Sequence, residues 1–246
     1  MNNWESFKNP PIQEAIFSVT FSEDFSAELL EQFINSDFVK AKFSPKAKQL
    51  FKAKATFEEK NGEFQTKNSS KTPNGYRLDS DDKSRTLILK SNQLSYHKIR
   101  SYCSWEESMS EFSEIWKNVS SDETHQCNNL GVRFVNVIKL PFESIELSDF
   151  FALYPTIPSG IPQTLEGFFM TVTIPKGEMR ANIIQTVESN DSVQNDKIGI
   201  ILDIDITKPI QRKLIIGEDF QEMRDYKNEL FFNIITEKTR NIIKNQ

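Results

Sequence analysis

Residues 128–141, NNLGVRFVNVIKLP, constrain the fold more than any other stretch of this sequence. The pattern indicates a β-strand, in which successive side chains point to opposite sides. One side carries Leu130, Val132, Phe134, Ile138 and Leu140, and the other carries Val135 and Val137. Because both sides are largely apolar, we expect this strand to be buried on both faces.

Two polar residues interrupt the pattern, Arg133 on one side of the strand and Asn136 on the other. A guanidinium group keeps its charge, so its burial requires a carboxylate or several carbonyl acceptors. The segment IILDIDITK offers Asp203 and Asp205, which point the same way on a strand and lie about 7 Å apart. If this strand pairs with residues 128–141, Arg133 bridges to one of the two carboxylates. The alternative is a ligand-binding Arg133 on an open sheet face.

Three further residues are candidates for ligand binding. We expect the amide of Asn136 to hydrogen-bond to the backbone at a bulge or a strand end, with ligand contact as the alternative. Tyr76 and Arg77, in the sequence NGYRLD, resemble a small aromatic-plus-cation site, although cation–π packing within one sheet explains the pair equally well. The candidate ligand-binding residues are therefore Arg133, Arg77, Tyr76 and Asn136.

The Asp203 and Asp205 pair also suggests a metal site. Metal-dependent hydrolases and nucleases need further carboxylates or histidines that converge from other elements. Glu188 lies in a neighbouring predicted hairpin and is the best additional ligand in the sequence. A solvated acidic face is the competing interpretation of the two aspartates.

The order of predicted elements is the same in both halves of the chain: strand, helix, three or four strands, long helix. In the first half, strands are predicted at 10–21, 49–59 and within 75–101, and helices at 26–39 and 104–120. In the second half, strands are predicted at 129–140, 164–174, 179–189 and 197–208, and helices at 144–154 and 219–244. Residues 60–75 are polar and form either a loop or an extended hairpin arm.

This order predicts the α+β class, with residues 1–122 and 123–246 as two similar halves, each an antiparallel sheet covered on one face by helices. The halves could align into one longer curved sheet, as in TATA-binding-protein-like or other duplicated saddle or barrel folds. The comparison concerns element order alone and implies no DNA binding. An open sheet face, or a groove where the halves meet, is the natural place for a site.

Composition narrows the possible partners and the compartment. The net charge of −5 and pI of about 5.3 argue against nucleic acid as the partner. No apolar run approaches the ~18 residues of a membrane span, and the first residues lack a signal-peptide pattern. The two cysteines lie in no metal-binding spacing. We therefore expect a cytoplasmic protein without a cofactor.

Four segments carry a resemblance to a known family: NPPIQEAIFSVTF, GYRLDSDD, the stretch from Tyr102 to Trp116, and above all GVRFVNVIKLP. Together they resemble a sporadically distributed family of uncharacterised bacterial and archaeal proteins of about this length. The resemblance covers most of the chain in order, and it implies no established activity, cofactor or catalytic residue. The patchy distribution of that family resembles that of horizontally moved genes, such as defence or toxin–antitoxin modules.

The sequence contains no GxSxG, HExxH, GxGxxG or P-loop pattern. We therefore expect a non-enzymatic binding or regulatory module that recognises a protein partner or a small anionic ligand. The alternative is a metal-dependent hydrolase or nuclease-like enzyme centred on Asp203 and Asp205. Binding of single-stranded nucleic acid would require aromatic rings exposed among lysines and arginines. The long closing helix could support a homodimer.

Overall fold

The computed structural model describes residues 4–44, 46–60, 62–119, 126–141, 146–163, 165–188 and 197–245. Its strands form one nine-stranded sheet in the order β2-β3-β4-β5-β1-β6-β9-β8-β7, with every neighbouring pair antiparallel. The strands are β1 (Ile12–Phe21), β2 (Lys48–Lys60), β3 (Glu63–Asp79), β4 (Arg85–Lys90), β5 (Gln93–Ile99), β6 (Cys127–Pro141), β7 (Phe169–Lys176), β8 (Met179–Val187) and β9 (Lys197–Arg212). The helices are α1 (Ala27–Ile34), α2 (Asp37–Lys42), α3 (Trp105–Val119), α4 (Leu147–Phe150), α5 (Ile216–Ile234) and α6 (Glu237–Lys244).

Strand β6 lies at the centre of this sheet, between β1 and β9. Its even-numbered side chains from Leu130 to Leu140 are buried on one side, and Val137 is buried on the other. The predicted burial is confirmed for one face, whereas Arg133, Val135 and Lys139 on the other face are only partly buried. The predicted pairing with the strand of Asp203 and Asp205 is also confirmed, because Arg133 lies opposite Asp205 and Val135 lies opposite Asp203.

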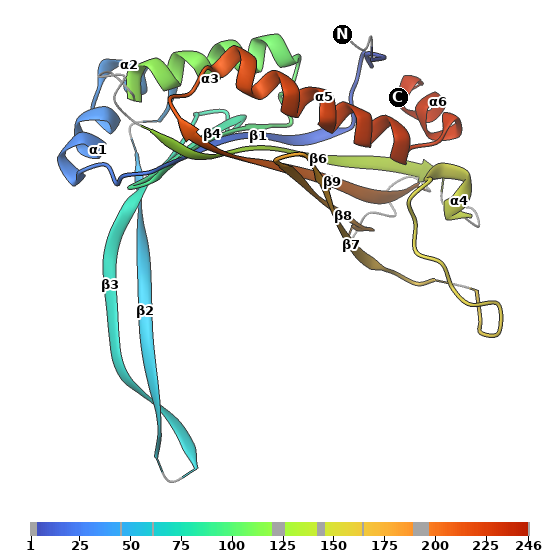
Figure 1. Cartoon of the computed structure of the whole chain (residues 1–246), viewed down its shortest axis with the longest axis horizontal. Helices are drawn as coiled ribbons and strands as arrows, with labels where there is room; N and C mark the ends of the chain where they lie inside the picture. Colours follow the sequence, from blue (N-terminus) through green and yellow to red (C-terminus); the bar gives the residue numbers. More distant parts are fainter. Residues whose placement is uncertain are drawn as a thin grey trace.

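The helices of the described residues cover one face of the sheet. Figure 1 shows α3 and α5 lying across the face above the central strands, while the opposite face curves away without a helix over it. Between the helices and the sheet, Phe17 of β1 contacts Phe134 of β6 at a ring-centroid distance of 6.0 Å, and Phe112 of α3 contacts Phe220 of α5 at 5.4 Å. One aromatic core therefore joins strands and helices from both halves of the chain.

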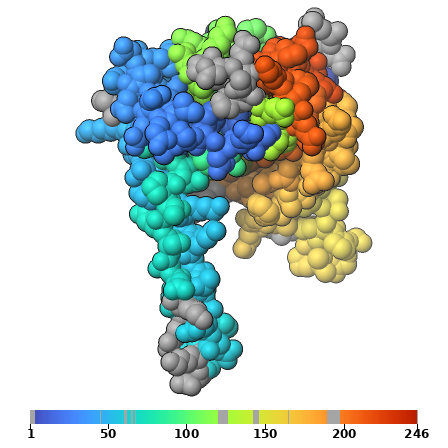
Figure 2. Space-filling view, turned by 60° about the vertical axis from the view of Figure 1, so that its left-hand side comes forward, coloured from blue at the N-terminus to red at the C-terminus, as the bar shows by residue number. Residues whose placement is uncertain are grey.

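Strands β2 and β3 continue beyond the sheet as a long two-stranded arm (Figures 1 and 2). The sequence predicts either a loop or an extended hairpin arm for residues 60–75. The structure shows the arm, and residues 63–75 belong to β3. Its side chains lack a core: Phe57 and Phe64 are 64% and 78% exposed, and Phe51 is also exposed. In Figure 1 the segment that leads from α4 to β7 projects in the same direction as the arm, so the open face lies between two projections.

Two helices predicted as continuous are each divided in two. The predicted helix at 26–39 ends at Asn35 and restarts at Ser36, whose hydroxyl accepts a hydrogen bond from the Val39 amide. The predicted helix at 219–244 breaks at Ile235, and Thr236 caps α6 in the same way through the Thr239 amide. In both cases a hydroxyl residue inside an apolar periodic pattern begins a new helix, because its oxygen binds a free amide of the first turn.

The α+β class is confirmed, with one large antiparallel sheet and several helices. The sheet is open, with β2 and β7 at its edges, so the barrel alternative is wrong. The predicted boundary between residues 122 and 123 lies outside the described residues. No helix in the described part of the chain is both long enough and apolar enough to cross a membrane.

Candidate functional site

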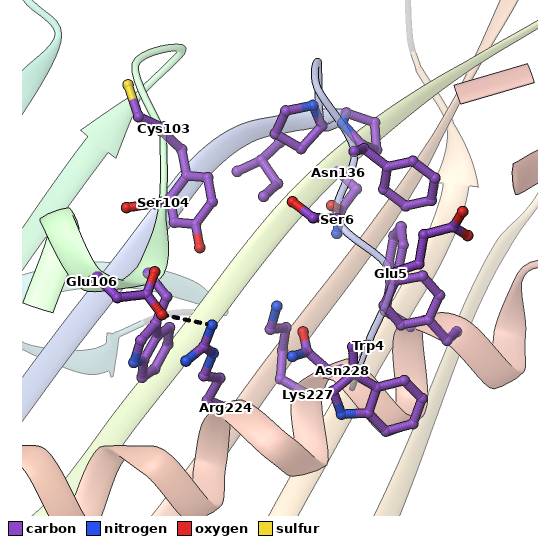
Figure 3. A pocket seen from close by; sticks show the side chains of 18 residues that line it. Trp4, Glu5, Ser6, Cys103, Ser104, Glu106, Asn136, Arg224, Lys227 and Asn228 are labelled. Atoms are coloured by element: carbon purple, nitrogen blue, oxygen red, sulfur yellow. Dashed lines mark ion pairs between the residues drawn. The ribbon is translucent and has the colours of Figure 1, made fainter. Parts of the chain in front are cut away.

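A cavity of about 190 Å³ lies on the helix-covered side of the sheet. Its walls come from the N-terminal segment, the turn before α3, the middle of β6 and the inner side of α5 (Figure 3). The lining residues are Trp4, Glu5, Ser6, Phe7, Pro10, Pro11, Ile12, Tyr102, Cys103, Ser104, Trp105, Glu106, Asn136, Arg224, Lys227, Asn228, Phe231 and Phe232. Of the four predicted ligand-binding residues, only Asn136 is among them.

Aromatic rings form much of the cavity wall. Trp4 stacks on Phe232 at a centroid distance of 5.4 Å, and Phe7 stacks on the same ring at 5.9 Å. Tyr102 meets Phe134 edge to face at 5.3 Å. These contacts fix the N-terminal segment against α5 and so form the aromatic wall of the cavity.

The amine of Lys227 enters this cavity from α5. Its nitrogen lies 4.2 Å from the centroid of the Phe134 ring, and Figure 3 shows the side chain pointing toward Ser6 and Asn136. Within the described residues it has no hydrogen-bond or ion-pair partner. Burial, with a smaller contribution from repulsion by the nearby Arg224, lowers the pKa of Lys227 to about 7.

Arg224 lies one turn before Lys227 on the same side of α5. Its guanidinium pairs with Glu106 at 3.0 Å and lies over the Trp105 ring at 5.4 Å. Glu106 is 69% exposed, so water screens this pair and leaves Arg224 available to a second anion. Glu5, the other carboxylate of the lining, pairs with Lys244 at 2.7 Å. The cavity therefore has a cationic side.

Neutral polar groups complete the cavity. The amide of Asn136 donates to the Leu202 and Phe134 carbonyls at 3.0 and 3.3 Å, which confirms the predicted backbone hydrogen bonding. Burial holds the pKa of Tyr102 well above its usual value, so its hydroxyl stays protonated and can donate. The indole N–H of Trp4 is buried and has no acceptor within the described residues.

Arg133 lies on the opposite, open face of the sheet. Its Nε donates to both carboxylate oxygens of Asp203, at 3.0 and 3.1 Å. The Asp203 side chain is 7% exposed and that of Arg133 is 43% exposed. The predicted ion pair between neighbouring strands is confirmed, with Asp203 as the partner. Burial raises the pKa of the adjacent Asp205, and Asp203 adds to the rise while Arg133 opposes it.

Arg77 and Tyr76 do not form the expected aromatic-plus-cation site. Neighbouring residues of a strand point to opposite faces, so Tyr76 and Arg77 of β3 lie on opposite faces of the sheet. Tyr76 reaches Glu31 of α1 at 3.5 Å, on the helix side. Arg77 donates to Asp79 at 2.9 Å, and Asp79 accepts from Thr86 at 2.7 Å. Burial acts to raise the pKa of Asp79, but the hydrogen bonds from Thr86, Arg77 and Lys48 outweigh it and lower the pKa to about 2.

The proposed metal ligands gain no third member among the described residues, where no group of three His, Cys, Asp or Glu side chains could hold an ion. Both oxygens of Asp203 accept hydrogen bonds from Arg133. Glu188, the expected additional ligand, forms an ion pair with Lys139. The geometry therefore adds nothing to the metal-dependent alternative beyond the two aspartates.

Sequence reasoning missed Lys227 and Arg224. The signal was present in the spacing of the closing helix, where positions 220, 224, 227 and 231 follow one another at three or four residues. Phe220 and Phe231 are apolar, so the two cations between them interrupt the stripe that faces the core. A buried-side cation on a helix is the same kind of signal as Arg133 on the strand.

No protein-family model matches this chain, and no curated protein sequence matches it either.

Proposed function

We propose that this protein is a binding module for a small anionic ligand with an apolar or aromatic body. The ligand lies in the cavity between α5 and β6, with its charged group toward Lys227 and Arg224 and its body against the aromatic wall. The observation that carries the proposal is the amine of Lys227, which enters the cavity without an anionic partner in the described residues.

The electrostatics support an anion. A cation removed from water loses hydration free energy, which a paired carboxylate restores through short charge-assisted hydrogen bonds. Lys227 lies against a ring face, a weaker partner for a cation than a carboxylate. Arg224 adds a second positive charge one turn away, and its present partner Glu106 is exposed. A ligand carboxylate between the two cations would compensate both.

The size and the walls define the rest of the ligand. A volume of about 190 Å³ suits a small organic acid rather than a nucleotide. The stacked rings of Trp4, Phe7 and Phe232 favour an apolar or aromatic group. Asn228 and the hydroxyl of Ser6 supply additional donors at the lining.

Isothermal titration calorimetry with phenylacetate tests this proposal, with phenylacetamide as the neutral molecule of the same shape. We expect phenylacetate to bind and phenylacetamide to bind at least about tenfold more weakly, because a charge-assisted hydrogen bond contributes roughly 1.5–3 kcal/mol. The variant Lys227→Met should lose the preference for the acid. Lys213→Met, a change at an exposed lysine outside the cavity, should retain it. Equal affinity for both probes in the wild-type protein would refute the proposal.

The strand order supports a further part of the proposal, that the two halves arose by duplication and form a saddle. Strands β1 and β6 are neighbours at the centre of the sheet, and each is flanked outward by the last strand of its own half, β5 or β9. A helix then follows on the same face, α3 after β5 and α5 after β9. In this arrangement the cavity lies where elements of the two halves meet.

The remaining predictions concern cellular context. Free Cys103 and Cys127 support a reducing compartment and hence a cytoplasmic location. A protein partner, a homodimer and a role in a defence system stay predictions.

A further inference from the structure

The cavity combines an unpartnered primary amine with groups that bind a carboxylate beside it. Lys227 and Arg224 line the same cavity from one side of α5, three residues apart. A ligand carboxylate held by Arg224 leaves the next carbon of that ligand near the Lys227 amine, since positions three residues apart on a helix are neighbours. In Figure 3 the Lys227 side chain extends past Arg224 into the space below Ser6 and Asn136.

We propose that Lys227 binds its ligand covalently, as a reversible Schiff base with the carbonyl carbon of a small 2-oxo acid that bears an aromatic or apolar side chain. This inference rests on the proposed binding of an anion in the same cavity. The carboxylate of the 2-oxo acid would lie against Arg224, its carbonyl would face the amine, and its side chain would contact the wall of Trp4, Phe7 and Phe232.

The chemistry requires no oxidant, reductant or metal. The neutral amine attacks the carbonyl carbon, so a C–N bond forms and the carbonyl oxygen becomes the hydroxyl of a carbinolamine. That hydroxyl leaves as water with one added proton as the C=N bond forms, and the nitrogen loses its protons to solvent. One amine and one carbonyl give one imine and one water, and the reverse reaction releases the ligand unchanged.

The surroundings of the amine favour its reactive, neutral form. The charged or titratable groups of the lining are Arg224 on its own helix, Glu106, Tyr102 and Cys103 before or within α3, and Glu5 in the N-terminal segment. Glu106 is occupied by Arg224 and Glu5 by Lys244. No carboxylate in the described part of the chain holds the Lys227 ammonium, and burial together with Arg224 lowers its pKa to about 7. A desolvated lysine beside another cation is a general way to activate an amine.

Borohydride trapping with phenylpyruvate tests the inference on the full chain. Sodium borohydride reduces an imine to a stable secondary amine, which adds the mass of the ligand less one oxygen atom. We expect one such adduct per chain by intact mass spectrometry, mapped by peptide mass spectrometry to Lys227. Trapping should increase as the pH rises from 6 to 8, because more of the amine is then neutral.

Phenyllactate and two variants provide the controls. Phenyllactate has the same ring and carboxylate but a hydroxyl in place of the ketone, so it should bind without being trapped. Lys227→Arg keeps a cation at this position and removes the primary amine, so it should lose at least tenfold in trapping. Lys213→Arg, at an exposed position outside the cavity, should be trapped like the wild-type protein. Lys227→Gln serves as a second variant if the arginine does not fit.

The outcomes separate this inference from the proposed function. Binding of both acids without any trapped adduct overturns the covalent step and leaves the anion site intact. An adduct spread over surface lysines, or one that persists in both Lys227 variants, also overturns it. Failure of both acids to bind overturns the proposed function together with this inference.

Discussion

Arg133 and Lys227 lie close to the same central strand on opposite sides of the sheet, and their surroundings differ. Arg133 points to the open face and donates three hydrogen bonds to Asp203, a buried carboxylate on the next strand. Lys227 points into a cavity on the covered face, where its amine lies over an aromatic ring and has no anionic partner among the described residues. The paired cation compensates a buried charge of the protein itself. Lys227, which has no anionic partner in the described residues, can still pair with an anionic ligand.

The largest difference should appear when Arg133 is removed. Arg133→Ala leaves Asp203 buried without its cation, and we expect a loss of about 2–3 kcal/mol, below the full cost of breaking a buried pair because Arg133 is partly exposed. Urea denaturation followed by circular dichroism measures this change. The double variant Arg133→Ala, Asp203→Ala should recover part of the loss. If the single variant is as stable as the wild-type protein, Arg133 does not have the structural role assigned to it.

Lys227→Met should change stability in the opposite direction. The substitution replaces a desolvated cation by an apolar chain of similar length, so we expect a gain of about 1 kcal/mol. The same urea titration tests this prediction, with Lys213→Met as the control that should stay within about 0.5 kcal/mol of the wild-type protein. A clear loss of stability would indicate that Lys227 has an anionic partner within the protein.

The advantage of Lys227→Met should depend on pH. The pKa of Lys227 is lowered to about 7 in the folded protein, below its ordinary value of 10.5, so the unfolded chain binds more protons between these two values. The stability of the wild-type protein therefore gains from this group as the pH rises from about 7 toward 10. Denaturation of both proteins at pH 6, 8 and 9.5 should show the difference narrowing. A constant difference would contradict the lowered pKa.

The smallest effect is expected in the arm. Phe57 and Phe64 are exposed on the β2–β3 hairpin, the arm that extends beyond the rest of the sheet (Figure 1). Phe57→Ser should change the free energy of unfolding by less than about 0.5 kcal/mol and leave phenylacetate binding unchanged. Thermal melts and calorimetry measure the two quantities. A large loss of stability would mean that the Phe57 side chain packs against other parts of the protein, contrary to its exposure.

Much of the central fold follows from local patterns in the sequence. Alternation along residues 128–141 predicts the central strand, and the need of Arg133 for a carboxylate predicts the neighbouring strand of Asp203. The first inference uses the alternation of side chains within one strand. The second uses the requirement of a buried guanidinium for a carboxylate, which holds whatever the distance along the sequence. The breaks at Ser36 and Thr236 were missed because the apolar spacing continues past them, although a hydroxyl residue can begin a new helix.

The cavity could not be predicted in the same way, because it forms from four segments far apart in the sequence. The sequence identifies Asn136 because it is a polar residue in an apolar strand. The structure shows that α5 and the N-terminal segment lie across the cavity from it. Lys227 is one charged residue in a helix with many. The helical spacing places it on the same side as Phe220 and Phe231, and the packing of α5 on β6 adds that this side lines a cavity.

The lysines of β2 have a consequence for colloidal behaviour. β2 is an edge strand, so the backbone amides and carbonyls on its outer side could pair with a strand of another molecule. Lys52 and Lys54 follow one another along that edge, and two such edges brought together would bring like charges close. Added salt weakens this repulsion because it shortens the distance over which charges act. Repulsion between these lysines therefore opposes strand pairing between arms of different molecules, despite the exposed phenylalanines, and this repulsion is strongest at low ionic strength.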